Sequence, residues 1–133
     1  MAIMDWQPTS ESTILDIVNE GRMRMNPVER RFWDAIHIYP EKWLQNPYGN
    51  TGGGFWAVGL IGRVVLWYND IEEGFNRSRY SRYGTIPDDE YWCNQDDLDH
   101  QVRQIMEEVK TGESVGGRFG PPQPGEYNPP ASQ

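Results

Sequence analysis

The sequence is poor in cysteine and has neither a long hydrophobic run nor a signal-like N-terminus. A single Cys93 excludes an internal disulfide and is typical of proteins from a reducing compartment. The first residues, MAIMDWQPTSE, contain an acid and Pro where a secretory signal requires an apolar region. The longest apolar run, 55–68, is too short to span a bilayer and contains Arg63. We therefore expect a cytoplasmic protein that does not bind membranes.

Residues that usually hold metals or phosphates are also scarce. The two histidines, His37 and His100, are far apart and accompany one cysteine, so a zinc site has no support. A calcium loop begun at Asp97 fails because Val102 stands where the pattern requires Gly. The glycines at 52–54 precede an apolar segment without Lys, which does not match a phosphate-binding loop. The sequence predicts neither a metal nor a cofactor.

Acidic charge is abundant, but it is concentrated in one segment. Residues 88–108 hold eight acids and one base, a net charge of −7, whereas residues 1–87 have a net charge of −1. A localised acidic field attracts basic partners and repels nucleic acid and anionic membranes. The alternative is a solvated acidic helix face that only aids solubility.

The stretch 55–69 predicts the β-hairpin on which the domain is built. Two β-branched and aromatic segments are joined by Gly62-Arg63, with Gly at the first central position of a type II′ turn. A two-residue turn pairs Ile61 with Val64. Both faces of this hairpin are apolar, so both must be covered. The expected faces are Trp56, Val58, Leu60, Val65 and Trp67 on one side, and Phe55, Ala57, Ile61, Val64, Leu66 and Tyr68 on the other.

Two helices are expected before the hairpin. Thr9 or Ser10 caps the first, and Gly21 is expected to end it. The Asn-Pro-Val-Glu sequence at 26–29 begins the second helix with a capping box. This helix ends at the Pro that opens 40–44, a stretch expected to form one more helical turn. The apolar stripe of the second helix is expected to be Val28, Phe32 and Ile36, with Trp33 beside it.

A polar third strand, 75–80, is expected to complete a small antiparallel meander. So polar a strand belongs at a sheet edge, where charged side chains discourage unwanted pairing. The predicted fold class is therefore α+β, with two N-terminal helices, the meander, and a C-terminal helix packed on the sheet. We expect one domain, 1–111, followed by a Gly/Pro-rich tail, 112–133.

The C-terminal helix is expected from about Asp96 to Lys110. Asn94 should cap it, and Gly112 should end it. Residues 112–133 have too few apolar groups to offset the entropy of ordering, which predicts a disordered tail. The expected apolar stripe of this helix is Leu98, Val102, Ile105, Met106 and Val109.

Two further groups of residues suggest chemistry. Arg77, Arg79 and Arg82 alternate with aromatic residues, as in surfaces that bind single-stranded nucleic acid, but the neighbouring charge of −7 favours internal pairing. We therefore predict no nucleic-acid binding. Cys93 precedes a predicted helix, which can lower a thiol pKa, but acids surround it in the sequence. We expect a buried structural cysteine and no catalytic residue.

These features predict a non-enzymatic module that binds a basic protein partner, because aromatic residues dominate interface hot spots. The most concrete version is an inhibitor or immunity-type protein that neutralises a basic toxin such as a nuclease. The alternative is a small-ligand-binding protein or enzyme with a cleft lined by Trp and Tyr, in which Asp70, Glu72 and Glu73 join the arginines as polar groups. The candidate binding residues are Asp88, Asp89, Glu90, Asp96, Asp97, Asp99, Arg77, Arg79, Tyr80 and Tyr83.

Overall fold

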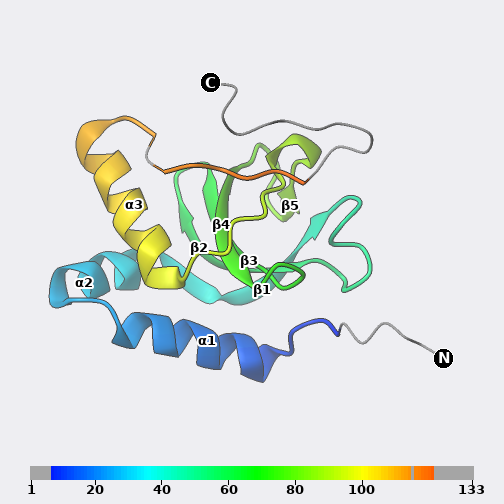
Figure 1. Cartoon of the computed structure of the whole chain (residues 1–133), viewed down its shortest axis with the longest axis horizontal. Coiled ribbons are helices and arrows are strands. Elements are labelled where there is room, and N and C mark those ends of the chain that lie inside the picture. Colours follow the sequence, from blue (N-terminus) through cyan, green and yellow to red (C-terminus); the bar gives the residue numbers. More distant parts are fainter. Residues whose placement is uncertain (1–6, 115, 122–133) are drawn as a thin grey trace, which may run out of the picture.

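A five-stranded sheet is covered by three helices on one face and by an irregular segment on the other (Figure 1). This computed structural model describes residues 7–114 and 116–121. The strands follow the order β4-β3-β2-β1-β5, in which only β5 is parallel to its neighbour. The predicted α+β class is confirmed. The elements are α1 (Glu11–Met23), α2 (Pro27–Ile36), β1 (His37–Gln45), β2 (Phe55–Ile61), β3 (Val64–Asn69), β4 (Gly74–Arg79), β5 (Thr85–Ile86), the 3₁₀ helix η1 (Asp88–Glu90) and α3 (Leu98–Thr111).

The first two helices begin where the sequence predicts. The Ser10 side chain accepts a hydrogen bond from the Thr13 amide at 3.2 Å. The side chain of Asn26 accepts from the Glu29 amide at 2.8 Å, and Glu29 accepts from the Asn26 amide at 2.9 Å. Both caps satisfy amides that have no partner within the helix.

The prediction that Gly21 ends the first helix is wrong, because α1 continues to Met23. Gly21 is buried at the contact with α3. A Cβ built on it would lie 2.8 Å from Cβ of Leu98, so the absence of a side chain lets the two helices approach closely. The glycine therefore serves packing and not helix termination.

The predicted apolar stripe of α2 is also partly wrong. Val28 is 53% exposed, whereas Glu29, Trp33 and Ile36 are buried. The helix is turned so that Glu29 meets α3, where Arg103 Nη1 lies 3.7 Å from its carboxylate. Contact with α3 therefore sets the orientation of α2, which differs from the orientation that the apolar spacing predicts.

The extra helical turn predicted at 40–44 is wrong, because these residues belong to β1. Pro40 lies in an irregular stretch between His37 and Glu41, where the register with β2 shifts. Such irregularities tolerate the missing amide of proline. Trp43 is fully buried in the core beneath the sheet, and this tertiary contact outweighs the local signal for a helix.

The hairpin of β2 and β3 forms as predicted at its turn. Gly62 has a φ of +58°, and Ile61 pairs with Val64. The register then shifts between Ala57 and Gly59. A β-bulge of this kind places an extra residue in one strand and displaces the residues beyond it. The observed pairs beyond the shift are Ala57–Trp67 and Trp56–Tyr68.

The predicted faces of the hairpin are therefore wrong for residues 55–58, which change sides at the bulge. Gly59 lies opposite Leu66, and a Cβ on it would come within 3.3 Å of the Trp33 ring. The expectation that both faces are covered is confirmed by two separate cores. The core under the helices contains Val58, Leu66, Tyr68 and Phe75 from the sheet, and the opposite core contains Phe55, Ala57, Val65 and Trp67 with Ile86 and Tyr91.

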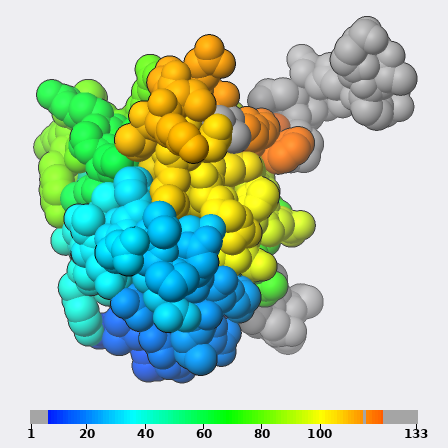
Figure 2. All heavy atoms as spheres, turned by 90° about the vertical axis from the view of Figure 1, so that its left-hand side faces the viewer, coloured from blue at the N-terminus to red at the C-terminus, as the bar shows by residue number. Residues whose placement is uncertain are grey.

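The C-terminal helix begins later than predicted. Its N-cap is Asp97, and Asn94 lies outside the helix. The predicted burial of Val109 is wrong, since its side chain is 62% exposed, while Gln101 is buried instead. The predicted end at Gly112 is confirmed by its φ of +78°. Figure 2 shows α1, α2 and α3 side by side on one surface of the molecule. Gln101 instead faces β4, where its side chain accepts a hydrogen bond from Arg77.

The polar strand β4 lies at the sheet edge, as predicted, but its side chains Asn76, Arg77 and Ser78 are buried, and Arg79 at its end is exposed. The segment 94–96 covers this edge, and the Phe75 amide donates to the carbonyl of Asp96 at 2.8 Å. Asn76 and Asn94 are joined by two hydrogen bonds, from Asn76 Nδ2 to the Asn94 carbonyl and from the Asn94 amide to Asn76 Oδ1. The edge is thus protected by coverage and not by exposed charge.

Part of the predicted tail contacts the domain. Residues 117–119 run beside residues 92–94 (Figure 1, dark orange) and exchange hydrogen bonds with Cys93 and Asn94. The remainder of the predicted disordered tail, 122–133, lies outside the described residues. None of the helices that the structure describes has the length and apolarity needed to cross a membrane.

Candidate functional site

The predicted binding residues do not form one site. Arg77 shows this most clearly, because it is buried within the fold. Its side chain is 4% exposed and joins β4 to α3. Nη1 donates to the side-chain oxygens of Gln101 at 2.6 Å and Gln104 at 2.9 Å, and Nη2 forms an ion pair with Glu108. Internal pairing of this arginine with the acidic segment is thereby observed, and its role is structural.

Two of the predicted acids are also tied into the fold. Asp99 is buried, with Arg24 Nε at 3.4 Å and Arg103 Nη1 at 3.2 Å from its carboxylate. Asp96 Oδ2 accepts from Gln101 Nε2 at 2.9 Å. Asp97 is exposed at the start of α3, and its side chain makes no capping hydrogen bond. Asp99 therefore joins α3 to the end of α1, whereas Asp96 and Asp97 lie at the start of α3, and the three acids do not gather into a binding surface.

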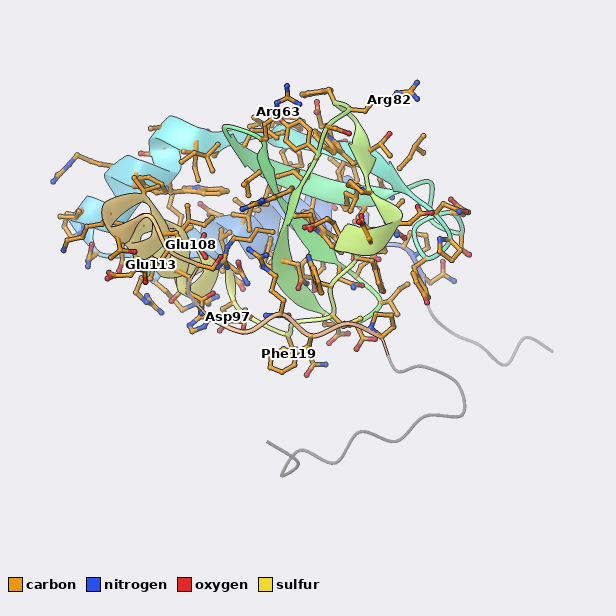
Figure 3. All side chains as sticks on the ribbon, turned by 90° about the horizontal axis from the view of Figure 1, so that it is seen from above. Arg63, Arg82, Asp97, Glu108, Glu113 and Phe119 are labelled. Atoms are coloured by element: carbon orange, nitrogen blue, oxygen red, sulfur yellow. The ribbon has the colours of Figure 1, made fainter. Side chains whose placement is uncertain are left out.

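Tyr80 and Tyr83, the two aromatic residues among the predicted binding residues, pack on Trp43. The Tyr80 ring meets it edge-on at 4.9 Å, and the Tyr83 ring lies at the same distance. The Tyr83 hydroxyl donates to Glu41, and this hydrogen bond raises the pKa of Tyr83. The exposed Arg82 extends away from the side of the molecule that carries Asp97 (Figure 3). Tyr80 and Tyr83 therefore cover a buried Trp.

The three consecutive acids of η1 divide into two roles. Glu90 Oε1 accepts from the Arg79 amide at 2.9 Å and from Trp92 Nε1 at 3.3 Å. Glu90 thus anchors η1 to the end of β4. Asp88 and Asp89 are exposed and line a cleft.

This cleft has a volume of about 410 Å³, within the range of small ligand sites. It lies between the loop after β1, the η1 region and residues 120–121. Three segments that are far apart in the sequence therefore line it. Its lining residues are Asn46, Pro47, Tyr48, Asp88, Asp89, Tyr91, Trp92, Gly120 and Pro121.

Tyr91 is held in the wall of the cleft by ring stacking and by a hydrogen bond. Tyr48 stacks on Tyr91 with ring centroids 4.2 Å apart. The Tyr91 hydroxyl points into the protein, where it accepts from Asn69 Nδ2 at 3.0 Å. Burial raises the pKa of Tyr91, so its phenol stays neutral in the physiological range. Trp92 Nε1 donates to Glu90, and this hydrogen bond holds the Trp92 ring in the wall of the cleft.

Carboxylates next to aromatic faces form an environment suited to a cation. Asp88 and Asp89 supply negative charge, and Trp92 supplies a π face. The guanidinium of Arg118 already lies 5.9 Å from the Trp92 ring centroid. Attraction of this kind contributes about 0.5–1 kcal/mol at exposed sites. The arrangement can therefore accept the side chain of an arginine or lysine.

A second cavity of about 410 Å³ lies between α1, α2 and the start of β1. Its rim carries Arg22 and Asp34, which form a two-pronged ion pair at 2.9 and 2.7 Å. This pair leaves little net charge for recognition, and none of the predicted binding residues lies there. The acidic cleft is therefore the stronger candidate.

The residues suggested for catalysis lie elsewhere. Burial raises the pKa of the Cys93 thiol, which disfavours the thiolate needed for nucleophilic attack. Asp70 is buried and accepts a hydrogen bond from the Thr9 amide at 2.9 Å, which fixes the segment before α1. In the part of the chain that the structure describes, His, Cys, Asp and Glu form no group of three placed to hold a metal ion.

Sequence reasoning found Asp88 and Asp89 but missed the aromatic residues around them. Tyr91 and Trp92 directly follow the three acids, and this adjacency was a usable signal. Tyr48 stands in a turn-rich loop forty residues away, where nothing local links it to the acids. In comparisons with protein-family models, with curated proteins and with solved structures, no match to this chain was found.

Proposed function

We propose that this protein is a small acidic protein-binding module that receives a basic side chain of its partner in the cleft at Asp88 and Asp89. The observation that carries this proposal is the meeting of two exposed carboxylates with the fixed rings of Tyr91 and Trp92. A guanidinium satisfies both, because it pairs with carboxylates and stacks on aromatic faces.

The segment that supplies Asp88 and Asp89 to this cleft also carries most of the net negative charge of the protein. The chain has a net charge of −8, of which −7 lies in residues 88–108. Part of that charge is paired internally through Arg77 and Arg103, while Asp88 and Asp89 face solvent. Exposed charge steers association with a basic partner. A cytoplasmic inhibitor or immunity-type protein that neutralises a basic toxin is the most specific form of the proposal.

The experiment measures binding of the peptide Gly-Arg-Gly-Arg-Gly at two salt concentrations. The test variant is Asp88→Asn/Asp89→Asn. The matched control is Asp16→Asn/Glu20→Gln, which removes two exposed acids from α1, a helix on the opposite side of the molecule from the segment 88–92 (Figure 1). Both doubles change the net charge equally, so only loss of the cleft carboxylates separates them.

The wild type is expected to bind more weakly as salt rises, since exposed charges are screened. The test variant should lose affinity by about 2- to 25-fold at low salt, the sum of two exposed ion pairs. The control should lose less than about twofold. Equal affinities in the two doubles would contradict the proposal.

A small cationic ligand in the same cleft is the second candidate, and the cleft volume of about 410 Å³ favours it. Free arginine amide distinguishes the two. A protein-binding site should bind the peptide more tightly than the amino-acid derivative, because neighbouring groups add contacts. Equal affinity for both would favour the small-ligand function.

A further inference from the structure

The C-terminal segment is bound to the domain as a short extended ligand would be. Asn94 Nδ2 donates to the carbonyl of Gly117 at 2.8 Å, and Asn94 Oδ1 accepts from the Phe119 amide at 2.8 Å. The Cys93 amide donates to the carbonyl of Phe119 at 2.5 Å. One buried side-chain amide thus pairs with the backbone of the segment much as a neighbouring strand does.

Side chains of the segment contribute one directed contact. The Phe119 ring points away from the domain (Figure 3) and is 64% exposed, so it adds little apolar burial. Arg118 instead places its guanidinium over the Trp92 ring. Gly120 and Pro121 then form part of the wall of the acidic cleft. Residues 92–94, on which the segment lies, therefore adjoin that cleft through Trp92.

Two opposing terms determine how strongly this segment binds the domain. Its hydrogen bonds to the domain are individually modest, and ordering a glycine-rich segment opposes them. Glycine loses more conformational freedom on ordering than any other residue. Gly117 takes part in the contact, and Gly116 and Gly120 flank it. A segment of another protein with an extended backbone and an arginine can bind the same groups of Trp92, Cys93 and Asn94.

We propose that residues 92–94 form the docking surface for an extended, arginine-bearing segment of the basic partner, and that residues 117–119 occupy it as a displaceable internal ligand. This inference rests on the proposed function of the neighbouring cleft. It adds the form of the partner: an extended backbone pairs with Cys93 and Asn94, and an arginine lies on Trp92. The arginine of the partner therefore replaces Arg118.

The test uses the full chain and two matched variants. Arg118→Gln removes the guanidinium from the Trp92 ring, and Lys110→Gln removes an exposed cation from the last turn of α3. Hydrogen exchange of the Cys93 amide reports whether the internal segment is docked. The probe in trans is the capped peptide Gly-Gly-Arg-Phe-Gly-Pro, which copies residues 116–121, with a second peptide that has Gln in place of Arg.

In Arg118→Gln, exchange of the Cys93 amide is expected to be about two- to fivefold faster than in the wild type, the factor that an exposed cation–aromatic contact contributes. The arginine peptide should bind this variant more tightly than the wild type by a similar factor. Lys110→Gln should behave as the wild type does, and the Gln peptide should bind less tightly than the arginine peptide.

Two results overturn the inference and separate its failure from that of the proposed function. In the first result, Gly-Arg-Gly-Arg-Gly binds in a way that depends on Asp88 and Asp89, but the copied peptide binds the wild type and Arg118→Gln equally well. This result overturns the competition between residues 117–119 and the partner and leaves the proposed function in place. Absence of binding by every basic peptide, with faster Cys93 exchange in Arg118→Gln, overturns the proposed function and this inference with it.

Discussion

Truncation of Ile105 tests how α3 is oriented, and with it the covering of the sheet. Ile105 is 3% exposed and packs in the core beneath the helices. Replacing a buried Ile by Ala typically costs about 2–5 kcal/mol. Ile105 also borders a shallow groove of about 210 Å³ beside Ile61 and Val64, so solvent can fill part of the space left. We therefore expect Ile105→Ala to lower the free energy of unfolding by about 2–3 kcal/mol, in the lower part of that range.

Val109→Ala is the matched control on the same helix. Both changes remove methyl groups from a β-branched side chain, but Val109 is 62% exposed. Its truncation should change the free energy of unfolding by less than about 0.5 kcal/mol. Urea unfolding followed by circular dichroism measures both. Equal losses, or a larger loss for Val109→Ala, would refute the orientation of α3 described here.

Three further changes test other parts of the structure. Gly74→Ala places a Cβ 2.3 Å from backbone atoms of residues 94–95, and it should cost more than about 2 kcal/mol in urea unfolding if that segment covers β4; a neutral effect would contradict the covering. Burial raises the pKa of Asp70 above the ordinary 3.8, so the wild type should lose stability relative to Asp70→Asn as pH rises from about 3.5 to 7. Urea unfolding at both pH values checks this sign, and a gain by the wild type would refute it. Cys93→Ser should leave peptide binding intact, since burial raises the pKa of this thiol; lost binding in a folded variant would show a direct role.

Local signals in the sequence were sufficient wherever the deciding contact is itself local. The capping box at Asn26 and the turn at Gly62 depend on residues within three positions, and both were predicted. The bulge beside Gly59 lies where the ring of Trp33, from another element, packs closely on the strand, and no local signal indicates this contact. Pro40 suggested the end of a helix because nothing local reveals that β2 pairs with this stretch.

The candidate site was predictable only in its charge. Asp88 and Asp89 stand out in any charge profile of the sequence. The rest of the cleft comes from residues 46–48, 91–92 and 120–121, which chain folding alone brings together. Asp96 and Asp99 looked equally suitable, but their carboxylates are bound by neighbouring side chains within the fold. Whether an acid is paired is a tertiary property, and sequence spacing does not reveal it.

The central claim is that the cleft beside Trp92 accepts a guanidinium from a basic partner. The most direct measurement is a titration of the ¹⁵N-labelled protein with Gly-Arg-Gly-Arg-Gly, followed by amide and indole N–H signals. The largest shifts should occur at the Trp92 indole and the amides of residues 88–92, and Asp88→Asn/Asp89→Asn should reduce them at the same peptide concentration. The Trp33 indole, which lines the cavity between α1 and α2, should not respond. Shifts centred on Trp33, or undiminished shifts in the double variant, would contradict the claim.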